Sequence, residues 1–353
     1  MTDSAAWQEN NALCNDGSDC IEKPYQGSHS YQVDIKHNDR DQQAIGNALY
    51  QDNDSQIIEL ITTESITTES ITTELKINES NTRSDAPIGL FDSGIGGLSV
   101  YLHLAQQLPA ERYLYYADTK HVPYGNRDSK DIEALTLVAI DWLYKQGCKL
   151  IVIACNSASA HALEVARYRY PQLPIVGLVP ALKPAVSQSK TGKIAVLATK
   201  ATLEGSLLNQ VIAEVATPKG SIVTKYFDPQ LVPWVEAGMP EDSETAQRLR
   251  EKIRQLAADE VDYLVLGCTH YPFFREFLLR EIEDKKLSLG VVDSGQAIAA
   301  RVQYLLVTNK ILALSQTPNV IKPLNFYASK YDTALIDMLP RLLGSEAVIE
   351  YHH

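Results

Sequence analysis

From Pro87 onwards, short aliphatic runs alternate with longer segments that have helical spacing. Each run is almost continuously apolar, which is typical of a strand buried on both faces of a parallel sheet. The predicted strands are 88–94, 112–118, 149–156, 173–178, 193–199, 262–269 and 289–295. Between them, residues 131–147 and 244–260 carry apolar side chains at helical spacing. The alternation predicts a mostly parallel α/β architecture, in which ligands bind at the C-terminal ends of the strands.

The first 84 residues have a different composition. They are rich in Asn, Asp, Gln, Ser and Thr, and their few large apolar residues cannot bury enough surface to offset the chain entropy. From Ile61 the sequence ITTES repeats every five residues, a period that fits neither a helix nor a strand. We therefore predict a disordered low-complexity extension over 1–84, and favour a tolerated extension over a regulatory or partner-binding tail. Cys14 and Cys20 lie in it and are discounted as catalytic or metal-binding groups.

Composition narrows the class of protein. A chain of 353 residues, 45% hydrophobic and 22% charged, suits a globular protein of one large or two modest domains. The net charge of −12 without a Lys/Arg block argues against a nucleic-acid-binding surface. Five scattered cysteines argue against a secreted disulfide framework and predict a cytoplasmic location. The N-terminus resembles no signal peptide, and no apolar run is long enough to span a membrane. The expected partner is a small molecule.

Two predicted strands end in the same way, in LIVIACNSASA at 150–160 and YLVLGCTHYPF at 263–273. A cysteine in a strand is most often a small core hydrophobe, and this interpretation suits Cys148. Cys155 and Cys268 instead stand at strand ends, before residues suited to begin a helix, where a thiol is biased towards thiolate. The matched pair is therefore predicted to be functional.

Paired thiols suit proton transfer at a stereocentre. One group removes a proton from one face of a carbon, another delivers a proton to the other face, and the reverse reaction exchanges the roles. Thiols fit because their unperturbed pKa of about 8.5 is close to working pH. A cysteine hydrolase would need only one thiol, and a dithiol redox centre normally has CxxC spacing. A non-catalytic module that binds an acidic metabolite or a partner protein stays open, but leaves the two thiols unexplained.

Other polar residues follow the predicted strands. Asp92 comes directly after the first strand, where it could cap a helix together with Ser93, act in catalysis, or do both. The glycines that follow form G-x-G-G, which is not the dinucleotide fingerprint. His270 is either structural or tunes the neighbouring thiol. The loop 121–127 is either a simple turn or, through its backbone donors and Tyr124, a clamp for a carboxylate.

The sequence also hints at internal duplication. DSGIGGLSV at 92–100 and DSGQAIAAR at 293–301 both follow an apolar strand, as do the two cysteine segments. Two similar α/β units facing each other would bring their strand ends around one cleft. Asp-Ser-Gly after a strand is also a common start of a helix, so the signal is weak by itself.

Taken together, these motifs resemble those of the glutamate racemases, in the cofactor-independent aspartate/glutamate racemase superfamily. The resemblance covers roughly 87–343 and runs in order through IGLFDSGIGGLSV, YYADTKHVPYGNR, IVIACNSASA, VLATKATLEGS, LVPWVEAG, LVLGCTHYP and VVDSG. So many motifs in order, at suitable separations, are highly specific. Aspartate racemases of the superfamily typically carry Glu where His270 stands. A related racemase or isomerase acting on aspartate or another small acid is the alternative.

The resemblance implies that Cys155 and Cys268 are the two acid/base thiols, with Asp92 assisting the first and His270 the second. In this family Thr usually stands at the position of Ser157, which keeps the hydroxyl and lacks one methyl group. The implied substrate-contacting residues are Asp92, Ser93, Tyr124, Gly125, Asn156, Ser157, Thr199, Thr202, Glu236, Thr269 and His270.

The fold implied by the resemblance is two pseudo-symmetric α/β domains with the active site in the cleft between them. Residues 85–178 would form the first domain, 179–288 the second, and 289–353 would return to complete the first. The resemblance implies glutamate as substrate, neither cofactor nor metal, and in a bacterium the supply of D-glutamate for peptidoglycan. Consistent with this, neither Lys193 nor Lys200 has the context of a Schiff-base lysine, and the histidines form no ligand-spaced cluster. The sequence leaves open whether the protein is a homodimer.

Overall fold

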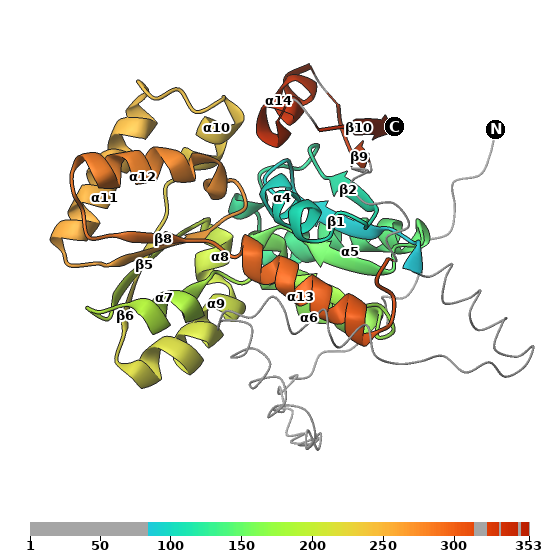
Figure 1. Ribbon diagram of the computed structural model, residues 1–353, viewed down its shortest axis with the longest axis horizontal. Coiled ribbons are helices and arrows are strands. Elements are labelled where there is room, and N and C mark those ends of the chain that lie inside the picture. The colour runs from blue at the N-terminus through green and yellow to red at the C-terminus, as the bar shows by residue number, and fades with distance from the viewer. Residues whose placement is uncertain (1–83, 314–322, 332, 345–346, 353) are drawn as a thin grey trace, which may run out of the picture. The chain divides into compact units, whose positions relative to one another are not determined.

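The computed structural model describes residues 84–313, 323–331, 333–344 and 347–352. Apart from Ser84, the predicted disordered extension lies outside the described residues, together with its repeats, Cys14 and Cys20. The described residues contain two β-sheets in which every neighbouring pair of strands is parallel, and helices pack on both faces of each sheet (Figure 1). The predicted parallel α/β class is confirmed.

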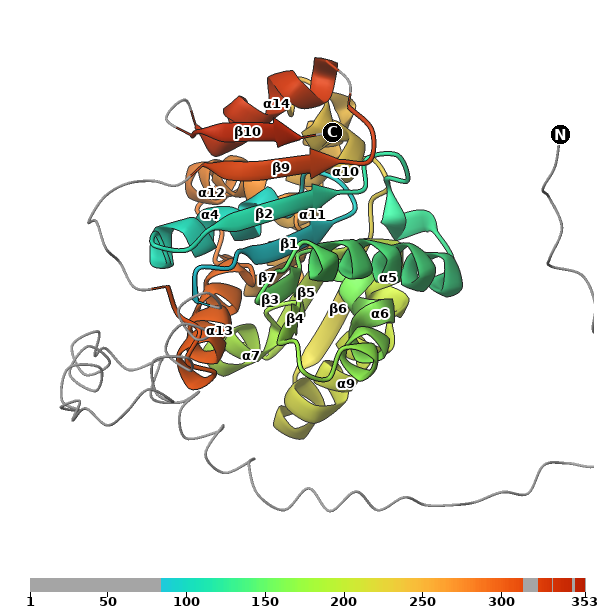
Figure 2. The ribbon, with the colours of Figure 1, turned by 90° about the vertical axis from the view of Figure 1, so that its right-hand side faces the viewer.

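The first sheet has six strands in the order β10-β9-β2-β1-β3-β4 (Figure 2). Its strands are β1 (Ile88–Asp92), β2 (Tyr113–Ala117), β3 (Leu150–Ile153), β4 (Ile175–Gly177), β9 (Leu324–Ala328) and β10 (Ile349–His352). Asp92 pairs with Ala117, and Phe91 pairs with Ile153. Because the strands are parallel and in this register, β1, β2 and β3 end at the same edge of the sheet.

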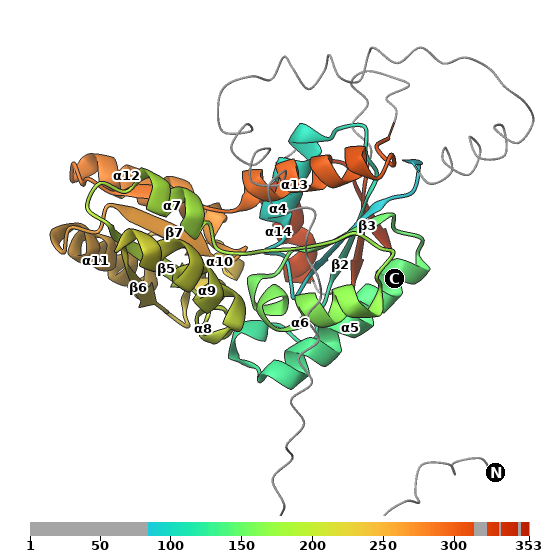
Figure 3. The same ribbon diagram turned by 90° about the horizontal axis from the view of Figure 1, so that it is seen from below.

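Helices cover both faces of the first sheet, as Figure 3 shows. The helices are α4 (Leu98–Gln107), α13 (Gly295–Thr308) and α14 (Thr333–Leu343) on one face, and α5 (Ser129–Lys145) and α6 (Asn156–Arg169) on the other. Successive side chains of a strand point to opposite faces, so Leu90 joins the core under α4 while Phe91 joins the core under α5. Burial on both faces explains why β1 is apolar up to its last residue, Asp92.

The second sheet has four strands in the order β6-β5-β7-β8. Its strands are β5 (Lys193–Ala198), β6 (Ile222–Tyr226), β7 (Tyr263–Gly267) and β8 (Gly290–Val292). The segments on one face are α7 (Leu182–Gln188), α9 (Ser206–Val211) and the π-helix η2 (Ile212–Ala216), and those on the other are α10 (Leu231–Glu236), α11 (Glu244–Ala258) and α12 (Arg275–Asp284). Short helical turns complete the chain: η1 (Tyr124–Asn126), α8 (Lys200–Glu204), η3 (Thr217–Lys219) and η4 (Tyr271–Phe274).

The predicted elements agree with the structure to within a few residues. The expected helices 131–147 and 244–260 are α5 and α11, which begin two residues earlier and on the expected residue, respectively. Both begin at a capping side chain: Asp128 accepts a hydrogen bond from the backbone N–H of Asp131, and Ser243 accepts one from that of Ala246.

One strand belongs to the second sheet although the predicted division of the chain assigned it to the first domain. The C-terminal return to the first domain was expected from residue 289, but β8 is hydrogen-bonded to β7 and belongs to the second sheet. The chain rejoins the first sheet only with α13, which packs on α4. The division into domains otherwise stays a prediction.

None of the helices in the described parts of the chain has the length and apolar character needed to cross a membrane.

Candidate active site

Polar residues at the strand ends of both sheets come together. Asp92 is the last residue of β1, and Cys155 follows β3 and begins α6. In the second sheet, Thr199 follows β5 and begins α8, and Cys268 follows β7. These are the C-terminal ends of parallel strands, where the sequence predicted the site.

Hydrogen bonds join these ends across the two sheets. The hydroxyl of Thr269 donates to Oδ2 of Asp92 (3.1 Å), and its carbonyl accepts from the hydroxyl of Ser99 (2.8 Å). The hydroxyls of Ser157 and Thr199 are 2.9 Å apart. All five side chains are buried, so each bond forms where water does not compete.

Cys155 is buried at the N-terminus of α6. Its Sγ accepts a hydrogen bond from the backbone N–H of Ala158 (3.5 Å) and donates to the hydroxyl of Ser93 (3.6 Å). Burial, and after it the charge of the nearby Asp92, raises the pKa of Cys155 to about 12, although the two hydrogen bonds act in the opposite direction. Cys155 therefore holds its proton at neutral pH.

Asp92 is completely buried beside this thiol. Its Oδ1 accepts a hydrogen bond from the backbone N–H of Gly94 (2.8 Å). Burial raises its pKa to about 6, although positive charge on His270 and the donors Gly94 and Thr269 lower it. The predicted helix N-cap at Asp92 is not found, because the glycine turn intervenes and α4 begins only at Leu98.

Cys268 has different neighbours. Nδ1 of His270 lies 3.9 Å from its Sγ, and Nε2 of the same ring lies 3.1 Å from Oε1 of Glu236. Burial alone would lower the pKa of His270, but the neighbouring sulfur and carboxylate outweigh it and raise the pKa to about 10. Unlike Cys155, Cys268 does not begin an α-helix, since the turn η4 starts three residues later with His270 as its N-cap. The imidazole is thus protonated on both ring nitrogens and positively charged next to this sulfur at neutral pH.

The loop 121–127 carries Tyr124 and Gly125. The hydroxyl of Tyr124 donates to Oδ2 of Asp118 (2.6 Å), so it is already engaged within the protein. The loop contacts the second sheet instead through its backbone: a Cβ at Gly125 would stand 2.8 Å from Cβ of Thr199. The hydroxyl proton of Tyr124 is therefore already donated within the protein, and the backbone of Gly125 packs against Thr199.

A short chain of hydroxyls lines the same region. Oγ1 of Thr199 lies 2.9 Å from both the hydroxyl of Ser157 and that of Thr202, and also accepts from the backbone N–H of Thr202 (3.3 Å). The structure thus brings three of the predicted hydroxyl residues together, two of them from α8 and its cap and one from α6.

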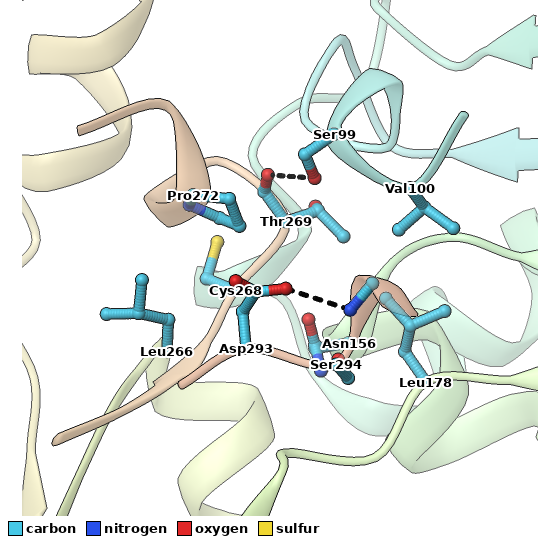
Figure 4. A pocket seen from close by; sticks show the side chains of 11 residues that line it. Ser99, Val100, Asn156, Leu178, Leu266, Cys268, Thr269, Pro272, Asp293 and Ser294 are labelled. Atoms are coloured by element: carbon cyan, nitrogen blue, oxygen red, sulfur yellow. Dashed lines mark hydrogen bonds between the residues drawn. The ribbon is translucent and has the colours of Figure 1, made fainter. Parts of the chain in front are cut away.

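Asn156 has a donor without a partner. Its side chain is buried, and within the described part of the chain Nδ2 has no hydrogen-bond partner. Asn156, Cys268 and Thr269 line a small cavity of about 10 Å³ that also borders Ser99 and Asp293 (Figure 4). A buried amide donor without a hydrogen bond costs free energy, and such a group is typical of a ligand-binding site.

Two neighbours of the site escaped the sequence analysis. Asp118 is buried after β2 and binds His121 (2.9 Å) as well as Tyr124, and it accepts from the hydroxyl of Ser329 (2.7 Å). Its signal was available, because it is a polar residue at a predicted strand end. Tyr115 lies inside β2 and its hydroxyl donates to the carbonyl of Gly94 (3.1 Å). A tyrosine within an apolar run gave no such signal.

Within the described ranges, no cluster of three or more His, Cys, Asp and Glu side chains could hold a metal ion. Lys193 pairs with Glu260 (2.6 Å) at the start of β5, and Lys200 lies 3.9 Å from Glu204 on α8. Both lysines are engaged in exposed ion pairs.

Known proteins share this arrangement of sequence and fold. Residues 88–302 match the Asp/Glu/Hydantoin racemase family. A glutamate racemase of Deinococcus radiodurans is 47% identical over 230 residues, covering 65% of this chain and 78% of that protein. One of Ectopseudomonas mendocina is 38% identical over 267 residues, covering 76% of this chain and 98% of that protein. The crystal structure of Escherichia coli glutamate racemase in complex with L-glutamate and the activator UDP-MurNAc-Ala matches with a TM-score of 0.63 at 30% identity, covering 75% of this chain and 97% of that chain. The chain therefore belongs to the Asp/Glu/Hydantoin racemase family.

Proposed function

We propose that this protein is a glutamate racemase, which interconverts L- and D-glutamate by proton transfer between Cα and two cysteines, without a cofactor. The observation that carries the proposal is the pair of buried thiols, Cys155 and Cys268, at strand ends of separate sheets that a hydrogen bond from Thr269 to Asp92 joins. The glutamate racemases that it resembles in sequence support glutamate as the substrate.

Unequal partners would give the two thiols unequal protonation. In the starting state Cys155 holds its proton, while Cys268 takes up the Cα proton as a thiolate stabilised next to protonated His270. As the C–H bond breaks, its electron pair passes to the substrate carboxylate and a new S–H bond forms at Cys268. Cys155 then gives its proton to the opposite face of Cα, where the electron pair returns from the carboxylate to form the new C–H bond, and the sulfur keeps the electron pair of its S–H bond. The reverse reaction starts from that state.

The carboxylate that receives this charge needs hydrogen-bond donors. The unpartnered amide of Asn156 and the first backbone N–H groups of α6 are available at the strand ends, and they would stabilise the transition state more than the substrate. The backbone of Gly125 would approach the substrate from the other side. Thr269 and Ser157 would add hydroxyl contacts, in the roles that the resemblance implied.

The wider role follows from the reaction. We propose that the protein supplies D-glutamate for peptidoglycan synthesis, which the family resemblance implies. The cytoplasmic location and the homodimer stay predictions from the sequence.

A direct test is to incubate the purified protein with L-glutamate in D₂O without added cofactor. NMR would follow the α-proton and polarimetry the optical rotation. We expect both signals to decay together, because inversion at Cα exchanges its proton for solvent deuterium. L-Aspartate serves as the competing substrate, and we expect it to react far more slowly.

Two results would count against the proposal. If L-aspartate or another acidic amino acid reacted faster than glutamate, the substrate would be wrong while the reaction class stood. If the α-protons of all the acidic amino acids persisted while a known racemase worked under the same conditions, the protein would be a binding module.

A further inference from the structure

Tyr115 lies beneath the turn that follows Asp92. The side chain is fully buried in β2 and stacks on Phe326, with ring centroids 5.2 Å apart and the planes inclined by 12°. Its hydroxyl donates to the carbonyl of Gly94 (3.1 Å). A buried tyrosine ring held by stacking has one orientation available, so the hydroxyl is a fixed anchor for the turn above it.

The same hydroxyl also lies against the start of α4. The residue before the helix is Gly97, which has no side chain to cap the first N–H groups. The first backbone N–H groups of α4 bond to the carbonyls of the preceding turn, since Leu98 donates to Ile95 (3.1 Å) and Ser99 to Gly96 (3.0 Å). A Cβ at Gly97 would stand 2.7 Å from the hydroxyl oxygen of Tyr115, so the tyrosine occupies the space where a side chain would be. Tyr115 thus packs directly against the turn from which α4 begins.

The anchored turn touches both walls of the site. Gly94 donates its backbone N–H to Asp92 (2.8 Å), which adjoins Cys155. On the other side, any Cβ at Gly96 would overlap the ring of His270. The turn therefore fixes the carboxylate of one wall and packs directly against the imidazole of the other. A displacement of this turn would disturb both acid/base partners at once.

We propose that Tyr115 is a positioning residue for racemisation, whose hydroxyl holds the glycine turn so that Asp92 and His270 keep their places beside the two thiols. The inference rests on the proposed function, and it assigns Tyr115 no contact with the substrate. It predicts that loss of the hydroxyl lowers the rate of proton transfer while substrate binding changes little.

The chain offers a matched control in Tyr113. This tyrosine lies two residues earlier in β2 and is also buried, and its single hydroxyl proton is shared between the carbonyls of Leu104 and Leu108, both 2.9 Å from the oxygen. Those carbonyls are at the C-terminal end of α4, away from the turn. Tyr113→Phe and Tyr115→Phe therefore each remove one buried hydroxyl that binds one end of the same helix.

The experiment compares the wild type with both variants. We expect both substitutions to lower the Tm by a similar few degrees, because each removes a buried hydrogen-bonding group. Tyr115→Phe should lower kcat by about tenfold or more with KM changed less than about twofold, since small misplacements of catalytic groups are costly. Tyr113→Phe should leave both constants within about twofold of the wild type.

A second measurement does not depend on activity. Amide hydrogen exchange of residues 93–98 should be faster in Tyr115→Phe than in Tyr113→Phe, because only the first variant loses the anchor. Equal kcat values in the two variants, or equal exchange in this segment, would overturn the inference. An inactive wild type would overturn the proposed function instead, and the exchange measurement would still decide the role of Tyr115 in the turn.

Discussion

The two thiol walls of the site are similar in sequence and different in their acid–base surroundings. Cys155 caps α6 and lies beside the carboxylate of Asp92, whose negative charge helps to raise the thiol pKa to about 12. Cys268 lies beside His270, which Glu236 helps to keep protonated at neutral pH. A carboxylate disfavours a negative charge on the neighbouring sulfur, whereas an imidazolium favours one.

This difference suggests how two identical side chains can start a reaction in different protonation states. Each wall needs a neighbour of a different kind, and each neighbour lies at or just after the end of a strand. Because Thr269 donates to Asp92 across the two sheets, the two acid–base pairs are also held in one network. Substitutions that change one wall at a time test whether these neighbours set the protonation states of the two thiols.

The largest effect should come from the thiols themselves. Cys155→Ala and Cys268→Ala should each lower racemisation by about 10³-fold or more, because each removes a proton donor or acceptor. Residual exchange of the α-proton with D₂O should be confined to one enantiomer of glutamate in each variant, and to opposite enantiomers in the two. NMR with each enantiomer separately would measure this.

Cys148 provides the control for these variants. It is a third buried thiol, and a Cβ at Gly89 would lie 2.9 Å from its sulfur, so it fills core space. Cys148→Ala should lower stability but leave turnover per folded molecule within about twofold. Near-normal racemisation by either Cys155→Ala or Cys268→Ala would contradict the two-wall scheme.

The partners should set the pH dependence. Activity should fall as Asp92 is protonated below its pKa of about 6 and as His270 is deprotonated above its pKa of about 10. Asp92→Asn should remove the acid limb of the profile, His270→Asn the alkaline limb, and each should lower kcat by about 10²-fold. A profile of kcat/KM from pH 5 to 10.5 would test this; the same limbs in wild type and variants would show that other groups titrate.

The partners should also affect stability in opposite directions. The folded-state pKa of Asp92 is raised, so its burial penalty is absent below about pH 4 and complete above about pH 6. Asp92→Asn should therefore stabilise the protein at pH 8 by about 1–3 kcal/mol, and this gain should vanish near pH 4. Chemical denaturation at both pH values would measure it, and a loss of stability at pH 8 would contradict a desolvated carboxylate.

For His270 the sign is the reverse. Its folded-state pKa is raised by favourable contacts, so its contribution is complete below about pH 6.5 and is lost as the pH rises through about 10. His270→Asn should destabilise the protein at pH 6 by at least about 1 kcal/mol, and by less at pH 10.5. Denaturation curves that shift equally at both pH values would contradict a protonated imidazole.

The smallest effect should come from the hydroxyl network. Ser157→Thr keeps the hydroxyl that faces Thr199 and adds one methyl group, so kcat/KM should stay within about threefold of the wild type. Ser157→Ala removes the hydrogen bond to Thr199 and should raise KM by about fivefold. Steady-state kinetics of both variants would test these expectations. A larger loss of kcat/KM in Ser157→Thr than in Ser157→Ala would show that the site has no room for the added methyl group.

The sequence predicted the strand ends well because the signal there is local. An aliphatic run that stops at Asp92 or Cys155 marks both the strand and its polar end within one segment. Strand β6 was missed for the opposite reason, since it lies at the edge of its sheet and most of its residues are exposed or half-buried. Its sequence, IVTKY, lacks the continuous apolar character of the inner strands.

Pairings between distant residues were beyond the sequence. His270 and Glu236 are 34 residues apart in the chain, and Ser157 and Thr199 are 42 apart, so no periodicity connects them. The resemblance to known racemases supplied these residues, but not their partners. The engagement of the Tyr124 hydroxyl by a carboxylate at the end of β2 could be seen only in the folded chain.

The most direct test of the two-thiol mechanism follows the conversion of a small fraction of the substrate. Wild-type protein is given L-glutamate in D₂O, the reaction is stopped early, and the enantiomers are separated and analysed by mass spectrometry. Two walls that act on opposite faces predict D-glutamate that carries deuterium at Cα, and recovered L-glutamate that still carries protium. Deuterium appearing in the recovered L-glutamate as fast as in the product would mean that one group serves both faces, and would contradict the roles assigned to Cys155 and Cys268.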